Sequence, residues 1–149
     1  MLKRYGFWLK AAGTAQLVTG VVHSLSFLSN PTPQNDIERK MYELMGTYHR
    51  DLGAGFDPSM NDIMTALSAC FAFLYLFGGL INLYLMRKKV DAAVMIGVLG
   101  INLLVFGPCF VVMLFFTFLP PVVLTGAVFL LLIVAAVVRS RNRAQGAEV

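Results

Sequence analysis

The side chains that could do chemistry lie near the end of one apolar segment and in the polar stretch after it. They include the two histidines, His23 and His49, and the carboxylates Asp51 and Asp62. Imidazole and carboxylate groups together suit a divalent metal, the edge of a haem or proton exchange. The candidate metal ligands are His23, His49 and Asp51. The wider set of candidate ligand-binding residues comprises Gln16, His23, Tyr48, His49, Asp62 and Asn102.

Each of these groups also has a plainer interpretation. His23 can be a neutral imidazole that bonds to a backbone carbonyl or to Tyr48. His49 and Asp51 stand two positions apart, so on a helix they point to different sides. Asp62 belongs to the first turn of an expected helix, where the helix dipole stabilises a carboxylate. We therefore predict no cofactor, and keep haem or a divalent metal as an alternative.

Sequence motifs of familiar catalytic sites are missing from the chain. No Gly-rich phosphate loop, H-E-x-x-H, G-x-S-x-G or C-x-x-C pattern occurs. The cysteines Cys70 and Cys109 fall inside apolar segments, where a disulfide on the outer face cannot form. The sequence thus favours a non-enzymatic protein, although it leaves enzymatic activity undecided.

Composition places these residues in an integral membrane protein. Of the 149 residues, 58% are hydrophobic and 13% are charged, whereas roughly a quarter of the residues of a soluble domain are charged. A membrane-spanning helix needs roughly 20 residues. Apolar stretches near residues 7–28, 63–86, 92–119 and 122–138 supply four spans, with the third kinked at Pro108. We expect an all-α four-helix bundle forming one transmembrane domain, residues 1–149.

A polar stretch separates the first two spans. The prolines in residues 31–33 should stop the first span. Asn35 then has the chemistry of an N-cap, with Glu38 as its capping-box partner. Apolar and charged residues occupy opposite faces over residues 36–52, which predicts an amphipathic helix in the outer interface or across the bundle mouth. Asp-Pro at residues 57–58 is typical of the N-cap and first position of the second span.

The basic residues indicate orientation rather than nucleic-acid binding. Nine of the twelve Lys and Arg residues flank the spans on the side of the two termini, and three lie in the polar stretch. The positive-inside rule then places both termini in the cytoplasm. The lipid bilayer with its anionic headgroups is the expected partner, and a homo-oligomer or a larger membrane complex is a further candidate.

Polar and small residues inside the first two spans mark the faces that should turn inward. Gly13, Gln16, Gly20 and His23 recur at helical spacing and share one face of the first span. Small residues allow helices to approach closely, and amide or imidazole groups can bond across them. The corresponding seam of the second span contains Ser68, Ala72, Tyr75, Gly79 and Asn82.

The last two spans carry fewer polar groups. Asn102 is the expected cross-helix hydrogen bonder of the third span, which a short turn makes the antiparallel neighbour of the second. The fourth span has Thr125 as its only polar group and should be peripheral to any site. The tail after Arg139 should be short and frayed.

The end of the first span carries a distinctive pattern. Val22-His23-Ser24 close this span, and the outer helix that follows contains Met41 and Met45. In these features residues 13–86 resemble a family of uncharacterised small bacterial membrane proteins, similar in outline to the DoxX-like proteins, whose first helix typically ends in Gly-His-Thr or a similar motif. Val22 stands where glycine is expected. The resemblance implies a multi-pass protein of the bacterial inner membrane, without a known catalytic residue.

Three functions remain open from the sequence. The leading hypothesis is a non-enzymatic accessory, binding or structural subunit, because three spans contain no Asp, Glu, Lys, Arg or His that could relay a proton or ion. The alternative is a ligand, metal or haem site at the outer mouth around His23. A small transporter is the third, and it requires a water-accessible path past Gln16 and Asn102.

Overall fold

The computed structural model describes residues 5–28, 32–51 and 53–146. The helices in order are α1 (Tyr5–Leu25), the 3-10 turn η1 (Ser26–Leu28), α2 (Asp36–Thr47), α3 (Met60–Arg87), α4 (Ala92–Phe116) and α5 (Leu119–Gly146). The expected helix stop at Pro31 and the basic residues Lys3 and Arg4 lie outside the described residues.

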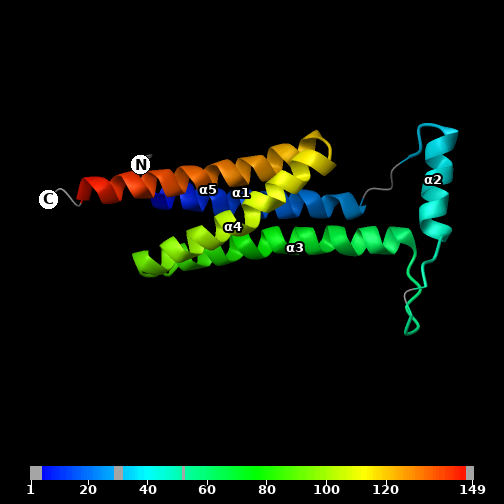
Figure 1. Cartoon of the computed structure of the whole chain (residues 1–149), viewed down its shortest axis with the longest axis horizontal. Helices are drawn as coiled ribbons and strands as arrows, with labels where there is room; N and C mark the ends of the chain where they lie inside the picture. Colours follow the sequence, from blue (N-terminus) through cyan, green and yellow to red (C-terminus); the bar gives the residue numbers. More distant parts are fainter. Residues whose placement is uncertain (1–4, 29–31, 52, 147–149) are drawn as a thin grey trace.

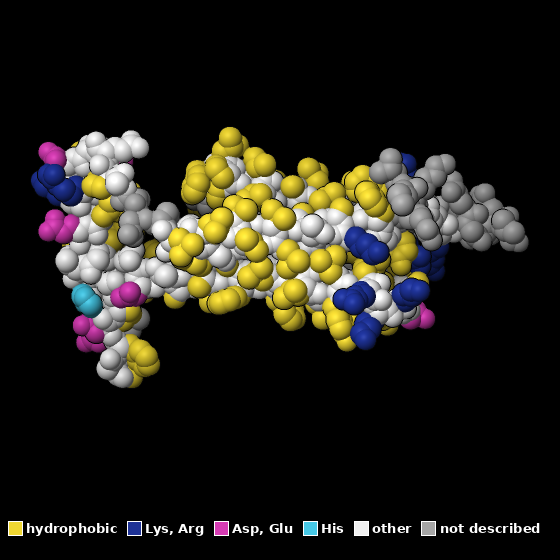
Figure 2. Space-filling view, turned by 180° about the vertical axis from the view of Figure 1, so that it is seen from behind, with side chains coloured by type: hydrophobic (Ala, Val, Ile, Leu, Met, Phe, Trp, Pro, Cys, Tyr) yellow, Lys and Arg dark blue, Asp and Glu magenta, His cyan; other side chains and the backbone are white. Residues whose placement is uncertain are grey.

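Four of these segments are long and apolar enough to cross a bilayer. They are Tyr5–Leu28, Met60–Arg87, Ala92–Phe116 and Leu119–Arg143. The four lie alongside one another in Figure 1, and Figure 2 shows hydrophobic side chains covering the middle of the bundle. The prediction of an all-α membrane bundle with a short helix between its first two spans is therefore confirmed. The chain is a small multi-pass membrane protein.

Helix α1 is the centre of the bundle, because both α3 and α5 pack along it. Small residues permit the contact with α3. A Cβ atom added to Gly79 would lie 2.7 Å from the backbone oxygen of Gly13, and one added to Gly20 would lie 2.7 Å from a side-chain carbon of Leu76. The inward face predicted for the first span is thus the face on which α3 packs.

Helix α4 leaves its sequence neighbour and packs on α5. It makes few contacts with α3 and many with α5, and it crosses the bundle obliquely in Figure 1. The rings of Phe110 and Phe129 stack with centroids 5.8 Å apart. Each ring fills the space above a glycine of the opposite helix, Phe129 above Gly107 and Phe110 above Gly126. The predicted pairing of spans two and three is therefore weak, because these complementary shapes hold α4 against α5.

The fourth span is longer than the sequence suggested. Helix α5 starts at Leu119, so both Pro120 and Pro121 stand in its first turn, where a helix needs no backbone donor. It continues to Gly146, and the prediction of a frayed tail after Arg139 is wrong up to that residue. Helix α4 runs through Pro108, and a kink there stays a prediction.

Helix α2 is shorter than the predicted 36–52 segment, because the chain becomes extended at Tyr48. Asn35 is its N-cap as predicted and accepts a hydrogen bond from the Glu38 backbone N–H at 2.9 Å. No residue of α2 is buried, and its apolar residues Ile37 and Leu44 are 82% and 62% exposed. The helix therefore does not form a lid, which had remained one of its two expected positions.

The start of α3 lies two residues beyond the expected Asp57. Ser59 is the N-cap, and its hydroxyl accepts from the Asp62 backbone N–H while the Asp62 carboxylate accepts from the Ser59 backbone N–H. Asp62 is in the first helical turn as predicted, and its role there is the reciprocal capping of α3.

The two ends of the bundle differ in charge. The start of α1 and the end of α5 lie at one end of the bundle, called the terminal end below, and α2 lies across the other (Figure 1). Lys and Arg gather at the terminal end, whereas the charged side chains of α2 lie on its side away from the bundle (Figure 2). The basic residues at the terminal end are those that the positive-inside rule places on the cytoplasmic side. That the terminal end faces the cytoplasm stays a prediction.

Candidate functional site

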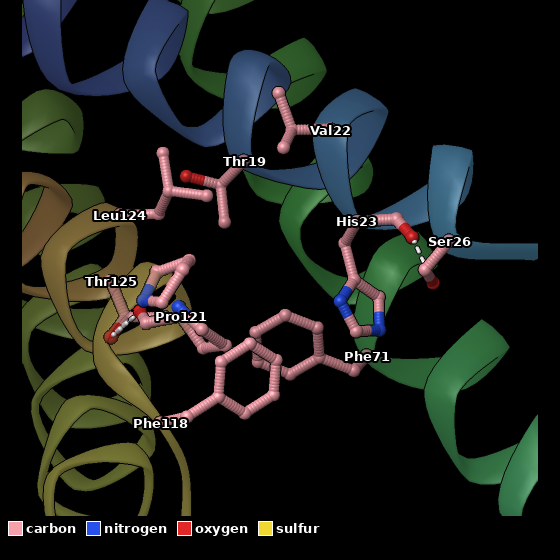
Figure 3. Close-up of a pocket in the computed structure, with 10 residues that line it drawn as sticks. Thr19, Val22, His23, Ser26, Phe71, Phe118, Pro121, Leu124 and Thr125 are labelled. Carbon is pink, nitrogen blue, oxygen red and sulfur yellow. Dashed lines mark hydrogen bonds between the residues drawn. The ribbon is translucent and has the colours of Figure 1, made fainter. Parts of the chain in front are cut away.

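A cavity of about 220 Å³ lies near the α2 end of the bundle. It lies between α1, α3, the turn before α5 and the first turns of α5, and it is open to the surroundings on one side (Figure 3). Its lining residues are Thr19, Val22, His23, Ser26, Phe71, Phe118, Pro120, Pro121, Leu124 and Thr125. Because α5 supplies several of them, the prediction that the fourth span is peripheral is wrong for this cavity.

Two polar atoms at this cavity have no hydrogen-bond partner among the described residues: His23 Nε2 and Thr19 Oγ1, both buried. The Ser68 backbone lies close enough to the His23 ring to act on it as a hydrogen-bonding group, although no hydrogen bond of regular geometry forms between them. The ring lies next to Phe71 in Figure 3. The Thr125 hydroxyl differs, because it donates to the backbone oxygen of Pro121 at 2.8 Å. Buried polar groups without partners are rare and costly. An apolar cavity with such groups suits a ligand that completes them.

Aromatic contacts fix the position of His23. Its ring meets Phe71 edge-on at a centroid distance of 4.7 Å. Phe71 contacts Tyr75 at 4.7 Å, and Tyr75 contacts Phe106 at 4.8 Å. These contacts form a column of rings from the cavity to the centre of the bundle. The imidazole is therefore oriented by packing against a rigid column.

A second polar feature is buried deeper, where three amide side chains meet. Gln16 and Asn82 are fully buried and Asn102 is 6% exposed. The amide nitrogen of Gln16 donates to Asn102 Oδ1 at 2.9 Å. The amide nitrogen of Asn82 donates to Gln16 Oε1 at 2.8 Å and to Asn102 Oδ1 at 2.8 Å. The amide nitrogen of Asn102 donates to Asn82 Oδ1 at 3.0 Å and to the Val98 backbone oxygen at 2.8 Å.

The amide cluster, Gln16, Asn82 and Asn102, ties α1, α3 and α4 together. Gly78 provides the room, because a Cβ atom there would lie 3.0 Å from the Gln16 amide nitrogen and 2.6 Å from the Phe106 ring. The three amides satisfy almost all of one another's hydrogen-bonding groups, so the cluster stabilises the packing of the three helices. The sequence identified Asn82 as a seam residue but not as a site residue, although an amide side chain deep within an apolar span is the signal that could have found it.

The candidates in the segment between α2 and α3 have local structural roles. His49 Nδ1 lies 2.7 Å from the Asp57 backbone oxygen and 3.7 Å from its carboxylate. Asp51 accepts from the Gly53 backbone N–H at 2.8 Å. Tyr48 follows the last residue of α2 and is 56% exposed. Each group is engaged with its own loop or exposed to the surroundings.

The structure does not assemble the predicted outer site. His23 belongs to the cavity, while His49, Asp51 and Asp62 belong to the α2–α3 connection and the cap of α3. Within the described ranges, no three His, Cys, Asp or Glu side chains are grouped as a metal ion would require. The set His23, His49 and Asp51 therefore does not form one ligand shell in this structure.

Comparisons with protein-family models, curated proteins and solved structures find no match. The resemblance to small bacterial membrane proteins thus stays an expectation, as does the bacterial inner membrane. What the fold and the spans define is the class, a small multi-pass membrane protein. Any assignment of function must rest on the cavity around His23 and on the arrangement of the helices.

Proposed function

We propose that this membrane protein is a non-enzymatic binding protein or subunit, and that the cavity around His23 holds a small, mainly apolar molecule with one carbonyl or hydroxyl group. The observation that carries this proposal is a pair of buried polar atoms, His23 Nε2 and Thr19 Oγ1, that make no hydrogen bond among the described residues and belong to a cavity lined mainly by apolar side chains. Apolar walls with a few convergent polar groups are the usual make-up of small-molecule sites.

The volume limits the size of the ligand. An engineered apolar cavity of about 150 Å³ accommodates benzene, so about 220 Å³ admits one substituted ring or a short acyl group. The aromatic and proline side chains provide flat apolar surfaces for such a ring. A carbonyl oxygen could accept from the Thr19 hydroxyl and from an Nε2–H tautomer of His23, whereas a ligand hydroxyl could pair with either. A quinone-type or phenol-type headgroup meets both requirements.

The same residues argue for binding rather than catalysis. Nucleophilic catalysis needs a hydroxyl or thiol within hydrogen-bond reach of a base that a third group orients. The unpartnered state of Thr19 Oγ1 and His23 Nε2 means that they do not bond to each other. The described lining of the cavity contains no carboxylate. His23 is thus placed to recognise a polar group of a ligand.

The other hypotheses have less support. A metal or haem at this cavity would have His23 as its only strong ligand among the lining residues. A transport path past Gln16 and Asn102 would require opening the amide cluster, because Gln16 and Asn82 are fully buried. Both hypotheses stay predictions, and so does assembly into a homo-oligomer or larger complex.

The two histidines permit a direct test by NMR of protein labelled with ¹⁵N-histidine, since only His23 and His49 contribute signals. The probe is a short-chain benzoquinone, with toluene as the apolar control that lacks a polar group. We expect the quinone to shift the His23 signal saturably and to leave His49 unchanged, with His23→Ala assigning the signal.

Thr19→Val retains the shape of the cavity and removes one hydrogen-bonding atom, so it should weaken quinone binding by about fivefold to tenfold, the value of one hydrogen bond. Toluene should bind both forms equally. Unchanged His23 signals at millimolar quinone, or equal shifts of both histidines, would refute the proposal. A Soret band or a stoichiometric metal in the purified protein would instead favour the haem or metal alternative.

A further inference from the structure

A second cavity, of about 580 Å³, lies at the opposite, terminal end of the bundle. It is lined by Tyr5, Phe7 and Lys10 of α1, by Arg139 and Asn142 of α5, and by Met86 of α3. Its composition differs from that of the His23 cavity, because two cationic side chains and an amide converge on it. The proposal for the His23 cavity does not involve this end.

Arg139 is held in place at this cavity. Its guanidinium carbon lies 4.9 Å from the centre of the Tyr5 ring, a cation–π contact that ties the end of α5 to the start of α1. Its Nε atom is buried and has no hydrogen-bond partner among the described residues. An oriented guanidinium in the lining of an open cavity is suited to a planar or tetrahedral oxyanion.

The charge at this cavity is not neutralised within the described part of the chain. Among the described residues that line the cavity there is no carboxylate, and neither Lys10 nor Arg139 takes part in a described salt bridge. Figure 2 shows Lys and Arg side chains gathered at this end of the bundle. The described lining of the cavity is therefore cationic, and it lies at the level where the apolar surface of the bundle ends.

We propose that this cavity binds a phosphate group, and that its source is the headgroup of an anionic phospholipid. Arg139 and Lys10 would hold the phosphate oxygens. The position favours a lipid over a free anion, because Phe7 lines the same cavity and is 42% exposed on the apolar surface, where an acyl chain would lie. Basic pockets between membrane helices are known to take anionic headgroups.

The test compares two double variants of the full chain in neutral detergent by native mass spectrometry. Arg139→Gln with Lys10→Gln removes the cavity cations, whereas Arg141→Gln with Arg143→Gln removes the same charge from residues of the same helix end that do not line the cavity. The probes are phosphatidylglycerol, phosphatidylcholine with identical acyl chains, and inorganic phosphate. Thermal unfolding in detergent establishes that each variant is folded.

We expect the native protein to retain phosphatidylglycerol in preference to phosphatidylcholine. The cavity variant should bind phosphatidylglycerol about 30-fold more weakly, since each headgroup-facing cation contributes about a factor of five, and the control variant should bind nearly as the native protein does. Equal losses in both variants, or equal retention of both lipids, would overturn the proposal. Displacement of the lipid by millimolar inorganic phosphate would overturn the lipid source and assign the cavity to free phosphate.

Discussion

Replacing Asn82 with leucine tests whether the amide cluster holds the bundle together. Leucine has the branching and approximate size of asparagine, so the change removes hydrogen bonds with little change in shape. Asn82 donates to Gln16 and Asn102 and accepts from Asn102, which makes three cross-helix bonds. The substitution deletes all three while the apolar surroundings remain.

The expected loss can be worked from these bonds. Cross-helix hydrogen bonds in membranes average about 0.6 kcal/mol and reach about 1.7 kcal/mol. Three of them therefore contribute about 2 kcal/mol, with a ceiling of about 5 kcal/mol. The substitution also leaves Gln16 Oε1 without its described donor, and an unsatisfied buried acceptor moves the loss toward the ceiling. We expect Asn82→Leu to lower the free energy of unfolding by at least about 2 kcal/mol.

The measurement is reversible unfolding in mixed micelles with increasing dodecyl sulfate. The single tryptophan, Trp8, packs against the core and reports on unfolding by fluorescence. Thr125→Val is the matched control, because that buried hydroxyl donates within its own helix and makes no described cross-helix bond. It should change stability much less than Asn82→Leu.

An Asn82→Leu protein as stable as the native one would refute the reasoning, because it would show that apolar packing replaces the amides without loss. The same conclusion would follow if Thr125→Val cost as much as Asn82→Leu.

Three further predictions concern other parts of the fold. Gly79→Ala should destabilise the protein by about 1–3 kcal/mol through overpacking, because the added Cβ atom would lie 2.7 Å from a backbone oxygen of α1. Gly97→Ala is the control in the same unfolding assay. It should be nearly neutral, because no atom lies within 4 Å of the position of its Cβ. Ser59→Ala should cost about 1 kcal/mol by removing the cap and should speed amide exchange in the first turn of α3. We expect α2 to lie in the membrane interface with its apolar face toward lipid. A nitroxide spin label attached at Met41→Cys should therefore be relaxed by lipid-soluble oxygen, and one attached at Lys40→Cys by a water-soluble nickel chelate.

Each of these predictions has a clear contrary result. Similar unfolding midpoints for the two glycine variants would mean that α1 and α3 are not in close contact. Unchanged exchange in α3 after the Ser59 substitution would mean that the cap does not hold the first turn. Equal accessibility of the two spin labels, measured in a background without native cysteines, would mean that α2 is not an interfacial helix.

The sequence by itself determined the spans, the short outer helix and its N-cap. Hydropathy, segment length and capping chemistry are local properties, so Asn35 and the apolar stretches could be interpreted without knowledge of any partner. It also identified the polar face of the first span, because the spacing of Gln16 and His23 is fixed by the helix itself. It was less exact at helix ends, where Ser59 rather than Asp57 caps α3 and α5 extends past Arg139.

Only the tertiary structure decided which faces meet. Gln16 and Asn102 are 86 positions apart, and nothing local states that Asn82 joins them. The sequence grouped His23 with His49 because both belong to the α2 end, but depth in the membrane does not fix direction around a helix. Packing of α5 against α1 brings Leu124 and Thr125 to the cavity beside His23. These choices follow from the complementary shapes of distant side chains, which a single sequence does not display.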